Sequence, residues 1–271
     1  MKEQVLVTGA SYFDLTSVSN QREYRIFVGA PDGEAPEEGY PVLYVLDGNA
    51  VFSIVAETAR LLGGNHPRAF GSLLVVGIGY PSADSRSVER VYDYTPPADP
   101  SVLPPRKDGK PWPPTGGCDE FIRFIEEQVK PQIERQYPVN RSRQSLFGHS
   151  LGGLFTLYTL FRRPELYRSY IAGSPSIWWN NGSLLQEEQA FADRIQQAPA
   201  DVRLLLSAGE LELHHPMRML GNAEDMYNRL ASHSGAGVDA SFHAFAGEGH
   251  LSVLPALIGR TVQYALEREH K

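Results

Sequence analysis

The stretch 144–154, QSLFGHSLGGL, changes from one kind of local structure to another within a few residues. Its first half is an apolar run that predicts a buried strand, and its second half continues as LFTLYTL with the apolar spacing of a helix. Ser150 lies at the turn between them, flanked by Gly148 and Gly152. This context is typical of a G-x-S-x-G elbow, in which a tight turn lifts the serine oxygen above the carboxyl edge of a sheet. We therefore predict that Ser150 is a nucleophile; the alternative is a serine that caps the helix.

The rest of the chain repeats the alternation of strand and helix. Apolar runs rich in β-forming residues predict eight strands, at 11–17, 23–30, 41–48, 72–80, 144–150, 168–174, 202–209 and 240–247. Helical patterns occupy 49–64, 119–137, 151–164, 183–197, 216–233 and 251–270. A short polar turn at 19–21 predicts that the first two strands form a hairpin at one edge. The sequence thus predicts an α/β fold with a mostly parallel central sheet of about eight strands flanked by helices.

Residues 81–118 interrupt this rhythm with the proline-rich segment PPADPSVLPPRKDGKPWPPTGG. Its centre cannot form a long helix or an inner strand, because proline lacks the N–H that both need. The aromatic residues Tyr92, Tyr94 and Trp112 favour an ordered, lid-like insertion over a disordered one. We predict one domain over residues 1–271, with this insertion as part of it.

Composition narrows the function classes. The formal net charge of −7 and the lack of a sustained basic run argue against nucleic-acid binding. The single cysteine, Cys118, excludes an internal disulfide framework and a cysteine-based zinc cluster. No apolar run is long enough for a membrane span, and the N-terminal residues lack the apolar core of a signal peptide. We expect a cytoplasmic protein, or a periplasmic one if an export segment has been removed, and no partner in the membrane.

A catalytic serine needs a base, and the base of this fold follows late in the chain. His250 lies in the loop GEGH between the last predicted strand and the last predicted helix, which makes it our candidate. His149 and His243 are better explained by packing. The pair His214 and His215 lacks a second set of ligands at metal-site spacing, so no metal site is predicted.

The acid should follow the strand at 202–209, where the loop carries Glu210 and Glu212. Position alone leaves the choice between them open. The two amides that would stabilise an oxyanion are expected at Leu151, directly after the serine, and at Asn49, where YVLDGN passes from a strand into a helix. The alternative for 47–49 is an ordinary turn.

Six stretches of the chain resemble one known family. They are PVLYVLDGNAVF, RVYDYTPP, GGCDEFIRFIEEQVKPQIERQY, LFGHSLGGLF, SPSIWWNN and GEGHLSVLPAL, and together they span residues 41–258. The elbow alone indicates the α/β-hydrolase superfamily. The order of YVLDGN, SPSIWW and GEGHLSVLP is similar to that of its esterase family, and within it to the siderophore esterases that hydrolyse enterobactin-type trilactones.

This resemblance implies a serine esterase with Ser150, His250 and Glu212 as its catalytic residues and no cofactor. It implies a small-molecule substrate, a catecholate siderophore in its iron-free or ferric form. Candidate substrate contacts are Arg90 before YDYTPP, the aromatic pair Trp178 and Trp179, of which one is expected to pack in the core, and His149 beside the serine. Two alternatives remain: a general carboxylesterase of the same family, acting on thioesters, carbohydrate esters or feruloyl esters, and a binding protein that has kept the fold without catalysis.

Overall fold

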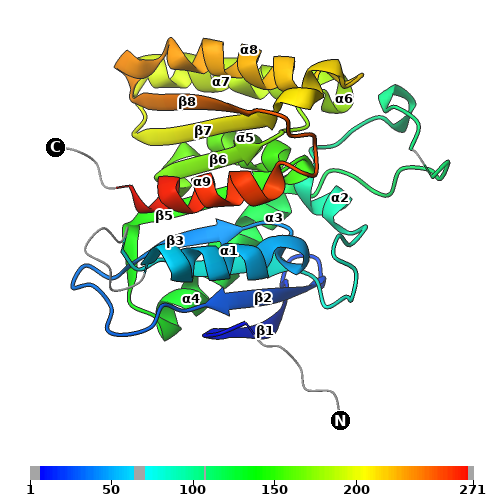
Figure 1. The fold of residues 1–271 in the computed structure, drawn as a ribbon. Helices are drawn as coiled ribbons and strands as arrows, with labels where there is room; N and C mark the ends of the chain where they lie inside the picture. The colour runs from blue at the N-terminus through cyan, green and yellow to red at the C-terminus, as the bar shows by residue number, and fades with distance from the viewer. Residues whose placement is uncertain (1–6, 64–70, 107, 268–271) are drawn as a thin grey trace.

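The computed structural model describes residues 7–63, 71–106 and 108–267. Eight strands form a single sheet in the order β1-β2-β4-β3-β5-β6-β7-β8 (Figure 1). In chain order they are β1 (Ala10–Thr16), β2 (Glu23–Gly29), β3 (Tyr40–Val45), β4 (Leu74–Gly79), β5 (Val139–His149), β6 (Ser169–Gly173), β7 (Val202–Gly209) and β8 (Val238–Phe245). All eight predicted strands are present.

The sheet is mixed in the way the sequence predicts. β1 and β2 pair antiparallel as a hairpin, and β2 also runs antiparallel to β4. The pairs from β4 through β3, β5, β6 and β7 to β8 are all parallel. Strands β3, β4 and β6 are buried along their whole length, as expected where helices cover both faces. The α/β-hydrolase architecture predicted from the sequence is confirmed.

Helices cover both faces of the sheet. The longer ones are α1 (Gly48–Gly63), α5 (Leu151–Arg162), α7 (Leu184–Gln197), α8 (Met219–Ala231) and α9 (Leu254–Leu266). The apolar side chains of α1 and α9 pack with one face of the strands, and those of α5, α7 and α8 pack with the other (Figure 1). Since side chains alternate along each strand, the two apolar clusters draw on alternate strand residues.

The prediction of one continuous helix at 119–137 was wrong. It consists of α3 (Cys118–Phe124), the π-helical turn η2 (Ile125–Val129) and α4 (Lys130–Gln136). Pro131 explains the interruption, because proline cannot donate the hydrogen bond of an α-helix interior and a π-turn before it absorbs the mismatch. The predicted last helix also begins later, at Leu254 and not at 251, because residues before it form turns.

The described residues of the insertion include a short helix that the sequence did not predict, α2 (Arg90–Tyr94), and a 3₁₀ turn, η1 (Pro100–Val102). Beyond α2 the chain extends away from the sheet and returns to α3 (Figure 1). Trp112 lies edge-on against the buried Trp179, with ring centroids 5.1 Å apart, and its indole N–H donates to the carbonyl of Pro104. These contacts give the described part of the insertion defined packing against the domain.

Candidate active site

Ser150 lies between the end of β5 and the first residue of α5. Its backbone has φ 62° and ψ −117°, a left-handed conformation that is unfavourable for a residue with a side chain. The surroundings hold it there: its N–H donates to the carbonyl of Gly173 at the end of β6, and its own carbonyl accepts from Leu154 and Ser176. This turn directs the side chain away from the strand, as the elbow motif requires.

The two glycines around the serine differ in how much space a side chain would have. A Cβ on Gly148 would lie 2.2 Å from the carbonyl oxygen of Gly152, so only glycine fits. A Cβ on Gly152 would meet its nearest neighbour, Leu46, at an ordinary 3.5 Å. Position 152 of the elbow therefore has room for a Cβ. The constrained position on the helix side is Gly153, where a Cβ would come within 2.9 Å of the Gly173 carbonyl.

His250 reaches the serine from the loop between β8 and α9. Its Nε2 lies 3.0 Å from Ser150 Oγ, and its Nδ1 lies 2.7 Å from a carboxylate oxygen of Glu212. Gly209, at the end of β7, lets this loop approach, because a Cβ there would lie 2.3 Å from the carbonyl oxygen of Glu248. Serine, histidine and carboxylate thus form one hydrogen-bonded chain across the carboxyl edge of the sheet.

Glu212 is only 2 % exposed, which is unusual for a carboxylate. Burial by itself raises its pKa, but hydrogen bonds from His250, from the Ser174 hydroxyl at 2.5 Å and from the Gly209 N–H at 2.9 Å outweigh burial and hold the pKa below its usual value. Glu212 is therefore ionised at neutral pH. The alternative carboxylate, Glu210, is exposed and accepts instead from the N–H of Gly247.

The amides of Leu151 and Asn49 belong to the first turns of α5 and α1, where backbone N–H groups have no partner within the helix. The Asn49 side chain is tied to the loop after β4: its amide nitrogen donates to the carbonyls of Tyr80 and Ser82, and its oxygen accepts from the N–H of Tyr80. Because α1 follows β3, α5 follows β5 and these two strands are parallel, both helices begin at the same edge of the sheet as the serine.

The comparisons with known proteins bear on this geometry. Residues 17–253 match the model of the family described as "Putative esterase". The chain belongs to this esterase family. It is 44 % identical to the ferri-bacillibactin esterase BesA of Bacillus subtilis, over 96 % of this chain and 90 % of that protein. It is 41 % identical to a siderophore enterobactin esterase of Emericella nidulans, over 76 % and 71 % of the two chains. The crystal structure of the BES protein from Bacillus cereus superposes with a TM-score of 0.90 at 36 % identity, covering 98 % of both chains. The predicted family and enzyme class, a carboxylic ester hydrolase, are confirmed.

The other candidate residues of the esterase lie in different surroundings. Arg90 is 8 % exposed, and its guanidinium donates two hydrogen bonds to the carboxylate of Asp47, at 2.6 and 2.7 Å. Trp179 is fully buried, whereas Trp178 is partly exposed on the loop that follows β6. The expectation that one of the two packs in the core therefore applies to Trp179.

His149 is 4 % exposed, and its ring lies 4.7 Å from that of His250. Within the described chain, neither ring nitrogen has a hydrogen-bond partner, so His149 packs without the partners that a buried histidine usually has. Burial, followed by the nearby charges of His250, Arg86 and Arg90, lowers its pKa well below the usual value. A neutral imidazole therefore lies against His250, with its ring tilted by 42°.

Other chemical roles find little support in the residues that the structure describes. The described residues include no group of three or more His, Cys, Asp or Glu side chains that could bind a metal. They also form no helix long and apolar enough to cross a membrane. Cys118 is buried, and burial raises the pKa of its thiol, which disfavours a thiolate nucleophile.

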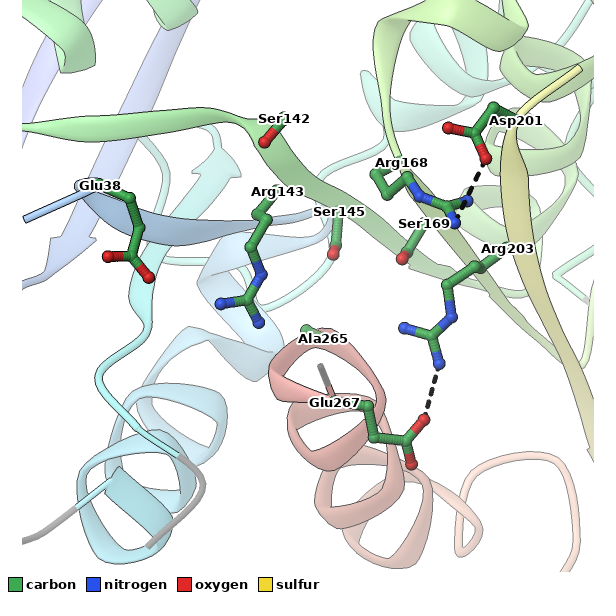
Figure 2. Close-up of a pocket in the computed structure, with 10 residues that line it drawn as sticks. All are labelled: Glu38, Ser142, Arg143, Ser145, Arg168, Ser169, Asp201, Arg203, Ala265 and Glu267. Atoms are coloured by element: carbon green, nitrogen blue, oxygen red, sulfur yellow. Dashed lines mark hydrogen bonds and ion pairs between the residues drawn. The ribbon is translucent and has the colours of Figure 1, made fainter. Parts of the chain in front are cut away.

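A cavity of about 590 Å³ lies at the opposite edge of the sheet, where the parallel strands begin (Figure 2). Arg143, Arg168 and Arg203 line it, and they come from β5, the start of β6 and β7. Arg168 pairs with Asp201, Arg203 pairs with Glu267, and Arg143 donates to the carbonyl of Leu266. These cations are thus matched by acceptors within the esterase itself.

Proposed function

We propose that this esterase hydrolyses the ester bonds of catecholate siderophores of the enterobactin type, with Ser150 as nucleophile, His250 as general base and Glu212 as the acid that orients the histidine. The observation that carries the proposal is the continuous chain from Ser150 Oγ through both nitrogens of His250 to the buried carboxylate of Glu212. The substrate class is supported by the names of the relatives, which are esterases of ferri-bacillibactin and of enterobactin.

The geometry supports a two-step acyl transfer. His250 Nε2 accepts the proton of Ser150 as the serine oxygen attacks the ester carbonyl, and the amides of Leu151 and Asn49 donate to the oxyanion that forms. The intermediate collapses as His250 returns the proton to the departing alkoxide. In a cyclic trilactone this first cut opens the ring, and the leaving hydroxyl stays attached to the acyl group. Water then attacks the acyl-enzyme by the same route in reverse and releases the linear product.

Glu212 assists without taking the proton. Its ionised carboxylate fixes the tautomer in which His250 Nδ1 carries a hydrogen and Nε2 is free to accept one, and it stabilises the imidazolium that forms during attack. The serine Oγ and the carboxylate are therefore connected through the ring, on opposite sides of it.

Two side chains are our candidates for contacts with the rest of the substrate. Trp178, partly exposed beside the serine loop, offers a face on which a catechol ring can stack. Arg86 is half-buried in the loop after β4, where burial lowers its pKa and the charges of Asp47 and Arg90 act on it. It is a better candidate than Arg90 for binding anionic catecholate oxygens, because the guanidinium of Arg90 is occupied by Asp47.

The test is a chromatographic time course of enterobactin, with and without iron, incubated with wild type and with Ser150→Ala. Linear trimer, dimer and monomer should form with wild type only. Ser150-dependent hydrolysis of p-nitrophenyl acetate without cleavage of either siderophore would refute the substrate and leave a general carboxylesterase. Absence of labelling by a fluorophosphonate probe, together with no hydrolysis, would leave a protein that binds without catalysis.

The role of Arg86 can be separated from the chemistry. We expect Arg86→Gln to raise KM for the ferric siderophore several-fold and to leave hydrolysis of the uncharged p-nitrophenyl acetate unchanged. Arg106→Gln is a suitable control, since Arg106 is a partly exposed arginine of the insertion that pairs with Asp108. Equal effects of the two substitutions would argue against a specific contact. A cytoplasmic location stays a prediction from the sequence, which fractionation of the producing cells tests.

A further inference from the structure

The turn between β3 and α1 is fixed by side chains of the insertion. Asp47 occupies it with φ 56°, a left-handed conformation in a residue that has a side chain. Its carbonyl accepts from the N–H groups of Ala50 and Val51, which starts α1 and sets the direction of the Asn49 amide between them. The conformation of Asp47 therefore decides where the second oxyanion donor points.

The insertion supplies the contacts that fix Asp47. The hydroxyl of Tyr94 accepts a hydrogen bond from the Asp47 N–H at 3.0 Å, and Arg90 donates to both carboxylate oxygens. Arg90 and Asp47 are both buried, at 8 % and 7 % exposure. A bidentate pair of this kind fixes orientation as well as charge. Both partners of Asp47 lie on α2, the short helix that the sequence did not predict.

Helix α2 is itself anchored in the core. The carboxylate of Asp93 accepts hydrogen bonds from the hydroxyls of Tyr24 on β2 and Tyr80 after β4, at 3.1 and 2.8 Å. The side chain of Asp93 is fully buried, and Arg22 lies 3.5 Å from it. The helix that carries Arg90 and Tyr94 is therefore held in place by buried hydrogen bonds of its own.

The Asp47 carboxylate also lies near the helix that carries the other oxyanion donor. A Cβ built on Gly152 would be 3.7 Å from Asp47 Oδ2, which places this oxygen against the first turn of α5, the helix to which Leu151 belongs. An unneutralised carboxylate at this point would oppose the negative charge that develops on the substrate oxygen, because charges interact strongly where water is excluded.

We propose that Arg90 is a positioning residue of the oxyanion hole: through its ion pair with Asp47 it fixes the turn that presents the Asn49 amide and neutralises a carboxylate that lies against the first turn of α5. This proposal rests on the proposed function, in that it takes Ser150 as the nucleophile. It differs from the sequence-based hypothesis, in which Arg90 binds the substrate. The two roles separate in kinetics, because a positioning residue affects kcat with any ester, whereas a substrate contact affects KM with anionic substrates.

The experiment compares Arg90→Met and Arg90→Lys with wild type on p-nitrophenyl acetate, which carries no charge and no catechol. We expect Arg90→Met to lower kcat on the order of 10- to 100-fold with little change in KM, since loss of one oxyanion donor costs about 10²- to 10³-fold. Arg90→Lys restores the charge without the paired geometry and should recover part of the loss. Affinity for a trifluoromethyl ketone, which mimics the tetrahedral intermediate, should fall by the same factor as kcat/KM.

Two further variants guard against a general loss of structure. Arg229→Met removes a similar bidentate pair, with the buried Glu188 between α8 and α7, and should lower the melting temperature without changing kcat. In the Arg90→Met background, Asp47→Asn removes the unpaired carboxylate and should return part of kcat. Wild-type kcat and ketone affinity in a folded Arg90→Met, or a change in KM alone, would overturn the proposal. Failure of the siderophore assignment would look different: enterobactin would survive wild type while the Arg90 effects on the small ester persisted.

Discussion

Charged and polar side chains lie at both edges of the parallel sheet, but their surroundings differ between the two edges. At the amino-terminal edge, Arg168 and Arg203 are paired with carboxylates and Arg143 with a carbonyl. These residues surround a cavity of about 590 Å³ (Figure 2). At the carboxyl edge, Ser150 is held in a strained backbone conformation, and His250 keeps 29 % of its side chain exposed.

The difference teaches that a strained backbone and a partly exposed histidine mark the candidate active site better than the size of a cavity does. Helices that follow parallel strands begin at the carboxyl edge, so their free amides point there, and an open α/β sheet binds its ligands at that edge. In the described part of the amino-terminal edge, the three arginines that line the cavity are instead paired with acceptors of the protein itself.

The largest effect is expected from Glu212→Gln at the carboxyl edge. The variant keeps the shape of the side chain but cannot stabilise the imidazolium of His250, so kcat should fall on the order of 10²- to 10⁴-fold. Steady-state kinetics on p-nitrophenyl acetate measure the loss. Glu210→Gln is the matched control two residues away, and it should stay within about twofold of wild type. An equal loss in both variants would contradict the assignment of the acid.

The second prediction concerns the elbow. Gly148→Ala should destabilise the protein by about 3 kcal/mol or more, because the new Cβ would overlap the Gly152 carbonyl oxygen and the backbone has to move. Gly152→Ala places the same methyl group at ordinary contact distances and should cost less than about 1 kcal/mol. Urea unfolding curves distinguish them. Similar stabilities would mean that the turn can relax around Gly148.

The third prediction tests the amino-terminal edge. Arg203 pairs with Glu267, donates to the carbonyl of Tyr264 and lies over the ring of that tyrosine at 4.2 Å. Arg203→Met should therefore cost about 1 to 2 kcal/mol of stability, within the range for a half-buried pair with a cation–π contact. Its kcat/KM should equal that of wild type. A loss of esterase activity in a stably folded Arg203→Met would break the contrast between the edges.

The fourth prediction is a pH dependence of stability at Asp93. Burial raises the pKa of this carboxyl to about 6, although Arg22 and the hydroxyls of Tyr80 and Tyr24 oppose the rise. A raised pKa in the folded state favours the folded protein at low pH, and this contribution is lost as the pH rises from about 4 through about 6. Relative to Asp93→Asn, wild type should therefore lose on the order of 2 kcal/mol of stability between pH 4 and pH 7. Parallel curves of stability against pH would show that the Asp93 pKa is not raised.

Much of this molecule could be read from local patterns. Every strand was predictable, because each is an apolar run bounded by turn residues, and the hairpin of β1 and β2 followed from the short polar turn at 19–21. Ser150 and His250 were predictable for the same reason: each stands in a recognisable loop directly after a strand. Position in such a loop gives the direction of approach even before the contacts are known.

The features that escaped prediction depend on contacts between distant segments. Helix α2 is five residues long and too short for a periodic pattern to reveal it, and its stability comes from Asp93 in contact with Tyr24 and Tyr80. A carboxylate two residues nearer the strand, Glu210, looks as suitable as Glu212 in the sequence. Only the approach of the 248–250 loop to Gly209 brings Glu212 and not Glu210 against His250.

The sequence by itself determined the order of strands and helices, the elbow and the class of chemistry, because these follow from periodicity, turn residues and spacing along the chain. Tertiary structure alone decided that Arg90 meets Asp47, that Trp179 is buried while Trp178 is not, and that one carboxylate of two is the partner of the histidine. Those outcomes depend on which side chains share a desolvated space, and the free energy of pairing charges there is set by neighbours that lie far away in the sequence.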